Sequence, residues 1–520
     1  MKQVTSSTYS TDKLSTWSGK NPSLSRHKQP PSQGLHLSAA DADHDMTVNP
    51  EYVNEDPRDG KQTATPSDFQ HISSFSSAYL TSPLSRRTLR TLASTCGWEV
   101  SLKAMCPLVA QPDVEQRPGR SPPRFIIDLS LNPEDRYKAL AREYKTQIQG
   151  LTTLFDDLLQ DVGLPTSYHG SINRIARLLL RRVKSPIETA ELRGIAEVAG
   201  VPMYLLVSFN TILDLLMGCT SGAVKTLEQG QRGSEAKLLH FRTLDWTMDP
   251  LRSVVVQLDF VRTELADPSR VLARSITYVG FVGVLTGVRP NLSISLNFRA
   301  VHNANTKRGQ FNFYFHHLLV LLGYRQSISS ILRSYTLPAD GQNAHAKDLA
   351  EISTELALRH TTAAYLVFCD GRSAIVMEKD YDSGPIRQSD NFIAATNNDE
   401  VAHESVSNAA TPVATEVAAG TSHVAAGLKE LLEESRERLN CITSRWKSCV
   451  RRAQQESKRR GASDSGQVEA HTTITPAETI NWVSAYPTTN EQTHYATVLD
   501  PTTGEVVWTL VYPSPYEQET

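Results

Sequence analysis

The sequence predicts an α+β protein in which helices come first and a β-rich body follows. Apolar residues recur at three- and four-residue spacing between about 133 and 217, which is the period of an amphipathic helix. After Cys219 the pattern changes to short runs rich in β-branched and aromatic residues, separated by turn residues. The chain closes with two more strand-like runs, and no internal repeat is visible.

Composition excludes several classes of protein. Lys+Arg 53 against Asp+Glu 56 gives a net charge of -3, which argues against a protein that coats nucleic acid and against a polybasic membrane binder. No apolar run approaches the ~18 residues of a membrane span, and Met1–Ser7 lacks the apolar stretch of a secretory signal. The six cysteines form neither a disulfide scaffold nor a CxxC zinc site. We therefore expect no metal, no cofactor and no nucleic-acid partner.

The chain is expected to divide into three parts. Residues 1–118 are rich in Ser, Thr, Pro, Gln and Asp with few apolar clusters, so we expect a disordered tail. Residues 119–218 are expected to form a helical segment, and 219–513 the main α+β domain. Two flexible insertions are expected within that domain, an Ala/Thr/Val/Ser-rich one at 400–425 and a charged one at 453–472.

Before Cys219, capping residues mark where elements begin and end. Asn132 and Pro133 are suited to open a helix after a strand. Ser185-Pro186-Ile187-Glu188 is a capping box that opens another helix, which stops at Gly200. The expected elements are a strand at 125–131, helices from 132 to about 161, at 171–183 and from 185 to 200, and a buried apolar segment at 201–217.

After Cys219 the expected elements are mostly strands. Asp370-Gly371 lies between two β-rich runs and is a strong hairpin signal. Strands are expected at 238–244, 253–261, 275–287, 292–298, 363–369, 373–378, 391–396, 493–499 and 505–512. Helices are expected at 311–337, 344–359 and 428–452.

The residues alone leave the role of Cys219 open. It lies where a long apolar region ends and a small polar strand begins, yet an isolated cysteine is most often a buried structural residue. Arg242 and Asp245 are three apart in an otherwise apolar run. They face opposite sides of a regular strand unless the strand ends or bulges there. On pattern alone, a surface ion pair is the likelier explanation for these two residues than a site.

Several motifs follow one another along the chain in an order that is far more specific than any one of them. They are Val198–Ser221 (VAGVPMYLLVSFNTILDLLMGCTS), Leu238–Trp246 (LLHFRTLDW), Gly283–Asn297 (GVLTGVRPNLSISLN) and Thr396–Asp399 (TNND). Upstream lies Phe125–Leu131 with the Arg136/Tyr137 helix, and the strand pair Tyr495–Leu510 lies near the end. Together, over about 123–513 with gaps, these motifs resemble the family of acid ceramidase and N-acylethanolamine acid amidase.

The resemblance implies an N-terminal-nucleophile cysteine hydrolase: a four-layer αββα sandwich preceded by a helical small-subunit segment. Such a protein is made as an inactive zymogen and cuts itself before the nucleophile, here between Gly218 and Cys219. The freed α-amine, with a reference pKa of about 7.7–8.0, then serves as base for the thiol. The implied reaction is hydrolysis of ceramide to sphingosine and a fatty acid through a Cys219 thioester. Hydrolysis of N-acylethanolamines is the alternative, and an uncleaved, non-catalytic lipid-binding homologue is the alternative of another class.

The resemblance also assigns roles to single residues. Arg242 matches the arginine that orients the cysteine, and Asp245 matches the aspartate that accepts a hydrogen bond from the α-amine. Asn397 matches the asparagine whose side-chain amide helps form the oxyanion hole. A later arginine of the family is matched best by Arg436, with Arg438 as the other candidate and an exposed helix charge as the alternative explanation of Arg436.

Further implications concern partners and compartment. The resemblance implies a heterodimer of the two fragments, transient contact with a membrane or lipid surface, and a lysosomal or vacuolar location, although no signal peptide is visible. The resemblance implies that Cys441 forms a disulfide to the small subunit, and Cys106 is the expected partner. Two free thiols are the alternative. The resemblance implies a glutamate at the position of Phe298. Cleavage of the precursor and an acidic pH optimum of the activity are therefore left open.

Overall fold

The computed structural model describes residues 119–154, 166–212, 218–228, 235–299, 301–302, 306–337, 346–400, 411–412, 422–459 and 465–513. The expected tail at 1–118, which includes Cys106, lies outside these residues, and so does most of the expected insertion at 400–425.

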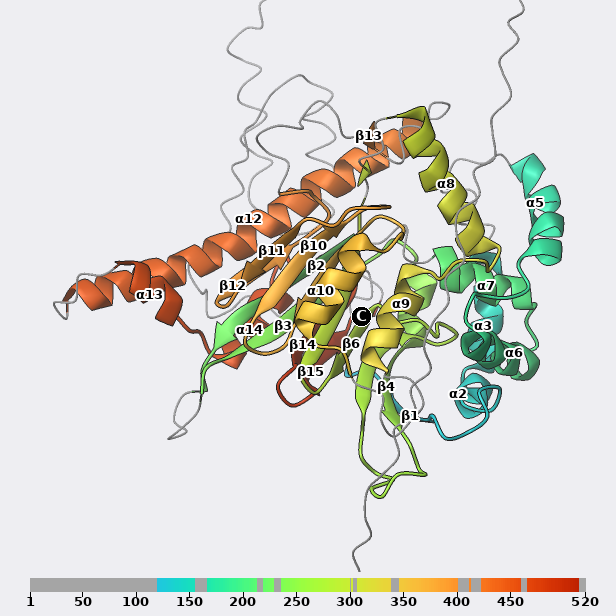
Figure 1. Ribbon diagram of the computed structural model, residues 1–520, viewed down its shortest axis with the longest axis horizontal. Coiled ribbons are helices and arrows are strands. Elements are labelled where there is room, and N and C mark those ends of the chain that lie inside the picture. The colour runs from blue at the N-terminus through green and yellow to red at the C-terminus, as the bar shows by residue number, and fades with distance from the viewer. Residues whose placement is uncertain are drawn as a thin grey trace, which may run out of the picture. The chain divides into compact units, whose positions relative to one another are not determined.

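Two β-sheets lie at the centre of the described part (Figure 1). The larger has the order β1 (Arg124–Asp128), β4 (Val255–Val261), β5 (Ala273–Tyr278), β6 (Thr286–Arg289), β7 (Leu292–Phe298), β9 (Ala364–Cys369), β10 (Ala374–Lys379) and β11 (Ile386–Ser389). The smaller has the order β12 (Phe392–Ala395), β2 (Gly218–Thr226), β3 (Lys237–Asp245), β14 (Thr493–Asp500) and β15 (Glu505–Val511). A separate short pair joins β8 (Val301–His302) to β13 (Thr411–Pro412). Within the two large sheets neighbouring strands run antiparallel, except that β1 is parallel to β4.

The two sheets face each other and are covered by helices on their other faces. Alternate residues of β2 show this arrangement, because Ala223 packs with residues of β9 and β10 whereas Val224 packs with the helix residue Trp446. α12 (Ser422–Arg459) and α14 (Pro476–Ser484) cover the smaller sheet, while α9 (Ile328–Thr336) and α10 (Leu349–Leu358) cover the larger one. The expected four-layer αββα sandwich is therefore confirmed.

The helical segment before Cys219 also contributes to the sandwich. It contains α2 (Lys138–Glu143), α3 (Lys145–Gly150), a 3-10 turn η2 (Leu151–Thr153), α5 (Thr166–Leu179), α6 (Pro186–Ala199) and α7 (Met203–Ile212). α6 begins and ends where its capping residues predict, since Ser185 Oγ accepts a hydrogen bond from Glu188 N at 3.3 Å and Gly200 has a φ of 71°. Because β1 is an edge strand of the larger sheet, this segment is part of the main fold.

Tertiary packing shifts the first expected helix. The chain makes turns over 133–137 and becomes helical only at Lys138. The reason is the close approach of this turn to α6, where a Cβ on Gly194 would lie 1.8 Å from Glu134 O. Arg136 then folds back onto the end of β1, and its guanidinium donates to Leu129 O and Leu131 O. These long-range contacts override the local helix signal at Asn132.

Three other expected elements differ in their boundaries. The expected helix at 311–337 is two helices, α8 (Lys307–Leu321) and α9, with Gly323 at a φ of 72° between them. The expected strand at 275–287 is likewise split into β5 and β6, with Gly280 at a φ of 91°. The expected flexible linker at 453–472 is largely helical, because α12 continues to Arg459 and α13 (Ser465–His471) packs against it. Charge alone does not distinguish a linker from a solvated helix.

Candidate active site

Cys219 is the second residue of β2, between β12 and β3, and it is fully buried. Its Sγ lies 3.4 Å from Arg242 Nη2 and 3.9 Å from Leu296 O. Its backbone nitrogen donates a hydrogen bond to Asn397 Oδ1 at 2.9 Å. The thiol and the backbone nitrogen of one residue therefore enter the same polar cluster.

β3 supplies both Arg242 and Asp245, and both are fully buried. β3 ends at Asp245, which pairs with Gly218, and the neighbouring strand β14 has a register shift between Thr493 and Tyr495 opposite this end. The strict alternation of side chains breaks here, so both residues reach the cluster. Thr493 Oγ1 donates to Asp245 Oδ1 at 2.6 Å. The alternative of a surface ion pair is wrong for these two residues.

α12 supplies Arg438 rather than Arg436. Arg438 is 1% exposed, and its Nη2 donates to Asn397 Oδ1 at 3.2 Å while its Nε donates to Thr220 Oγ1 at 3.2 Å and lies 3.6 Å from Asp245 Oδ2. Arg436 is exposed, because two residues along a helix turn the side chain by about 200°. The preferred match of Arg436 to the site is thus corrected in favour of Arg438.

Asn397 lies two residues beyond the end of β12 and is held from several sides. Its backbone N–H donates to Ser435 Oγ at 2.7 Å, and its Oδ1 accepts from both Cys219 N and Arg438. Its Nδ2, the group expected to face an oxyanion, donates to Phe298 O at 2.8 Å. In the intact chain this amide is therefore engaged by the backbone of β7.

Burial dominates the electrostatics of the cluster. It raises the pKa of the Cys219 thiol to about 11, although the Arg242 guanidinium acts in the opposite direction. Burial likewise raises the pKa of the Asp245 carboxyl, against the opposing effects of Arg438 and Thr493. Among the described residues, Asp245 Oδ2 accepts no hydrogen bond. The intact chain thus keeps the thiol protonated and leaves one buried acceptor open to a further donor.

Sequence reasoning missed polar residues that connect the cluster. Ser435 on α12 and Thr493 on β14 hold Asn397 and Asp245, respectively. Asn297 on β7 accepts from Ser221 Oγ at 2.6 Å. One signal was available in the sequence, since Ser293, Ser295 and Asn297 alternate with Leu and Ile along an otherwise apolar strand and so place polar groups on one face.

Cys441 is disulfide-bonded, unlike the other cysteines that the structure describes. Cys441 forms a disulfide whose partner lies outside the described residues, whereas Cys219, Cys369 and Cys449 are free. A free thiol at Cys441 is therefore wrong, and its pairing with Cys106 stays a prediction. Within the described ranges, no group of three or more His, Cys, Asp or Glu side chains is placed to hold a metal ion.

Comparison with known proteins gives matches to parts of the chain. The family model described as the beta subunit of N-acylethanolamine-hydrolyzing acid amidase matches residues 120–183. Acid ceramidase of Mus musculus is 34% identical over 192 residues, which are 34% of this chain and 45% of the relative. N-acylethanolamine-hydrolyzing acid amidase of Caenorhabditis elegans is 26% identical over 191 residues, 35% of this chain and 49% of the relative. The chain thus spans about half the length of these curated relatives.

A solved structure of a Caenorhabditis elegans N-acylethanolamine-hydrolyzing acid amidase ortholog aligns with a TM-score of 0.34 at 16% identity, covering 57% of this chain and 100% of that one. The layers define an αββα sandwich with a buried cysteine at the start of an inner strand. The family-model and relative matches make the chain similar, over parts of its length, to the beta subunit of N-acylethanolamine-hydrolyzing acid amidase and to acid ceramidase.

Proposed function

We propose that this chain is an N-terminal-nucleophile amidohydrolase that cleaves the N-acyl amide bond of a lipid after cutting itself between Gly218 and Cys219. The placement of both reactive atoms of Cys219 carries the proposal. Its Sγ lies 3.4 Å from Arg242 Nη2, and its nitrogen lies 2.9 Å from Asn397 Oδ1. A cysteine that only packs in a core needs no guanidinium beside its sulfur.

The intact chain has the properties of a zymogen. The nitrogen of Cys219 is an amide that cannot accept a proton, and burial holds the pKa of the thiol at about 11. In the cut, Sγ adds to the carbonyl carbon of Gly218, the C–N bond to Cys219 breaks, and that nitrogen takes the thiol proton. Water then hydrolyses the thioester, which yields the Gly218 carboxylate, the free thiol and an α-amine.

Turnover uses the new α-amine as the base. It takes the proton of Sγ, sulfur attacks the carbonyl carbon of the lipid amide, and the substrate amine leaves with that proton. Water hydrolyses the resulting thioester to the fatty acid. Arg242 stabilises the thiolate, and Asp245 Oδ2 accepts a hydrogen bond from the α-amine. We assign stabilisation of the oxyanion to Asn397 Nδ2 and Arg438, which requires Asn397 Nδ2 to leave Phe298 O, 2.8 Å away in the intact chain.

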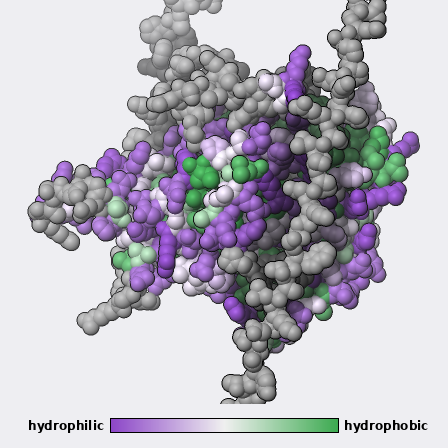
Figure 2. Space-filling view, viewed as in Figure 1, coloured by the Kyte–Doolittle hydropathy of each residue, from purple (hydrophilic) through white to green (hydrophobic). Residues whose placement is uncertain are grey.

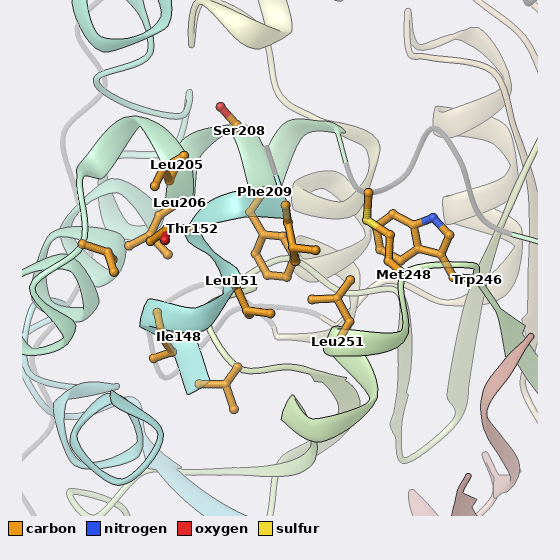
Figure 3. A pocket seen from close by; sticks show the side chains of 13 residues that line it. Ile148, Leu151, Thr152, Leu205, Leu206, Ser208, Phe209, Trp246, Met248 and Leu251 are labelled. Carbon is orange, nitrogen blue, oxygen red and sulfur yellow. The ribbon is translucent and has the colours of Figure 1, made fainter. Parts of the chain in front are cut away.

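An apolar cavity beside the cluster supports a lipid substrate. It begins at Trp246, directly after Asp245, and its lining is mostly apolar, as is typical of small-molecule sites. Figure 3 shows Trp246 and Met248 at one end and Ile148 toward the other. The lining residues lie on both sides of the proposed cut and include Leu151, Leu154, Leu205, Leu206, Phe209, Leu251 and Val279. We propose that this cavity holds the acyl chain.

Ceramide is the substrate we favour, which would give sphingosine and a fatty acid. Relatives named acid ceramidase are 34% identical in Mus musculus and 25% in Homo sapiens, and the worm N-acylethanolamine-hydrolyzing acid amidase is 26% identical, so identity does not separate the two substrates. N-acylethanolamines are the second candidate, because a shared acyl chain suits the same cavity. An uncleaved lipid-binding protein is the alternative of another class, because this chain has the apolar Phe298 where the family resemblance implies a glutamate.

Access to such a substrate involves a lipid surface in this proposal. Tyr168, Ile175 and Leu178 on α5 are 60%, 57% and 63% exposed, beside the basic residues Arg174 and Arg177. Figure 2 shows this apolar patch over α5 at the right of the view, next to hydrophilic residues. An exposed apolar face flanked by basic residues is typical of helices that lie on membranes. No helix in the described part is both long and apolar enough to cross a bilayer.

The test uses the purified full chain at acidic pH. We expect two fragments, the larger beginning at Cys219 by N-terminal sequencing, and hydrolysis of ceramide in a panel of N-acyl lipids. Cys219→Ala should stay whole and bind substrate without turnover. A whole wild-type chain that still hydrolyses ceramide would refute the mechanism, and a whole and inert one would favour the lipid-binding alternative. Reducing and non-reducing gels of the cut protein test the Cys106–Cys441 prediction.

A further inference from the structure

Asn297 is the point at which the larger sheet reaches into the cluster on the smaller one. It lies near the end of β7 and is fully buried. Its side chain spans the space between the sheets and contacts β2, β3 and the end of β12. A buried amide that connects three strands of the opposite sheet needs an explanation beyond packing.

The amide of Asn297 has two acceptor and two donor contacts. Its Oδ1 accepts from Ser221 Oγ at 2.6 Å and from Arg242 Nη1 at 3.4 Å. Its Nδ2 donates to Ala395 O at 3.2 Å and to Thr396 O at 3.3 Å. The orientation of the amide follows from these partners, because a guanidinium only donates and a carbonyl only accepts.

These contacts reach the two groups that touch the atoms of Cys219. Arg242 directs Nη1 at Asn297 and Nη2 at Cys219 Sγ. The carbonyls of Ala395 and Thr396 belong to the two residues immediately before Asn397, which accepts from Cys219 N. One side chain thus fixes Arg242 on one side of the nucleophile and Asn397 on the other.

We propose that Asn297 is a positioning residue that sets the distance between Arg242 and Asn397 across Cys219. This role rests on the proposed function. Asparagine suits it because aspartate would turn an acceptor toward the two carbonyls, and a short residue would leave a buried guanidinium without this partner. Asn297 lies outside the lining of the apolar cavity, so it acts on the chemistry rather than on acyl-chain binding.

The same strand offers a matched control. Ser295 is also fully buried and faces the same side of β7, where its Oγ hydrogen-bonds His240 Nε2 at 2.9 Å. Removing that hydroxyl takes away a buried hydrogen bond between the sheets, and the described contacts of Ser295 include neither Arg242 nor Asn397. A purely structural effect should therefore appear in both variants.

The experiment compares Asn297→Ala, Asn297→Asp and Ser295→Ala with the wild type in full-length protein. The readouts are the rate of self-cleavage, kcat and KM on an N-acyl lipid, and the thermal midpoint. We expect Asn297→Ala to lower kcat about 100-fold and to slow cleavage at least about tenfold, with KM changed less than about threefold. Asn297→Asp keeps the shape and the Arg242 contact and should lower kcat about tenfold. Ser295→Ala should stay within about threefold of wild type.

Each outcome decides the proposal. If kcat of the Asn297 variants falls no further than that of Ser295→Ala, or if only KM rises, Asn297 has no positioning role. If Asn297→Ala does not fold, the comparison of Asn297→Asp with Ser295→Ala decides. A wild type that neither cuts itself nor hydrolyses any lipid amide would overturn the proposed function and this role with it. If the wild type is active, the variants test the role of Asn297 separately from the proposed function.

Discussion

Glu191 on α6 forms the most buried ion-pair group between the segment before Cys219 and the domain after it. Its side chain is 0% exposed and accepts from Arg333 Nη1 at 2.5 Å and Nη2 at 2.7 Å, and from Arg136 Nη1 at 3.2 Å. Arg136 belongs to the early segment, whereas Arg333 lies on α9 of the main domain. One carboxylate thus balances two buried guanidinium groups across the proposed cut.

Glu191→Gln tests the strength of this connection. Removing one partner of a buried ion pair costs about 3–5 kcal/mol, because the remaining charge stays buried without compensation. Glutamine keeps the size and one acceptor oxygen, and Glu188 still lies close enough to attract Arg333. We therefore expect the free energy of unfolding to fall by about 3 kcal/mol, at the lower end of that range.

The assay is urea unfolding followed by tryptophan fluorescence, in a Cys219→Ala background that keeps the chain whole. Glu197→Gln is the matched control, because Glu197 lies on the same helix, pairs with Lys138, and has a side chain that is 71% exposed. An exposed pair of this kind should contribute far less than a buried one, because water screens the charges. A loss for Glu191→Gln below about 1 kcal/mol, or equal to that of the control, would refute the argument from burial.

Three further predictions concern the site. Arg438→Gln should lower kcat about 100-fold or more in a lipid amide assay, whereas the exposed Arg436→Gln should stay within about twofold; similar losses would contradict the assignment. Burial, with Arg242 nearby, lowers the pKa of His240 to about 3. The folded chain therefore keeps this ring neutral, and stability is lost as pH falls from about 6.5 toward 3. Between about pH 7 and pH 4.5, the free energy of unfolding should fall by about 2–3 kcal/mol less in His240→Asn than in the protein that keeps His240, both carrying Cys219→Ala. An equal dependence on pH in the two proteins would rule this out. Leu205→Trp should fill the cavity and reduce kcat/KM for long-chain amides at least about tenfold relative to short-chain ones. The control Leu358→Trp, at a side chain that is 78% exposed, should not change this ratio. An equal fall of kcat/KM for long and short chains would count against an acyl site.

Local chemistry made several elements predictable from the sequence. The N-cap of α6 at Ser185 and its end at Gly200 depend on hydrogen bonds and a backbone angle within a few residues. The hairpin between β9 and β10 turns at Asp370-Gly371, where Gly371 has a φ of 94°. The αββα arrangement followed from the resemblance of ordered motifs rather than from periodicity.

Long-range packing decided the features that pattern could not. The helix signal at Asn132 was overridden by the approach of Glu134 to Gly194 on another helix. The choice between Arg436 and Arg438 depended on the rotation of α12 against the smaller sheet, which the local sequence does not define. Arg242 and Asp245 could share a site only because β3 ends and β14 is irregular beside it.

The sequence by itself determined that Cys219 begins a small polar strand after a long apolar region. It also determined the order of the polar motifs that follow it, with Arg242, Asp245 and Asn397. Only the tertiary structure decided that Cys219, Arg242, Asp245, Asn397 and Arg438 meet, and that Asn297 joins them from the opposite sheet. The physical reason is that these contacts connect residues far apart in the chain. Cys219 and Asn397 are 178 positions apart, and the pairing of β12 with β2 brings their atoms together. The packing of the larger sheet and of α12 against this sheet adds Asn297 and Arg438.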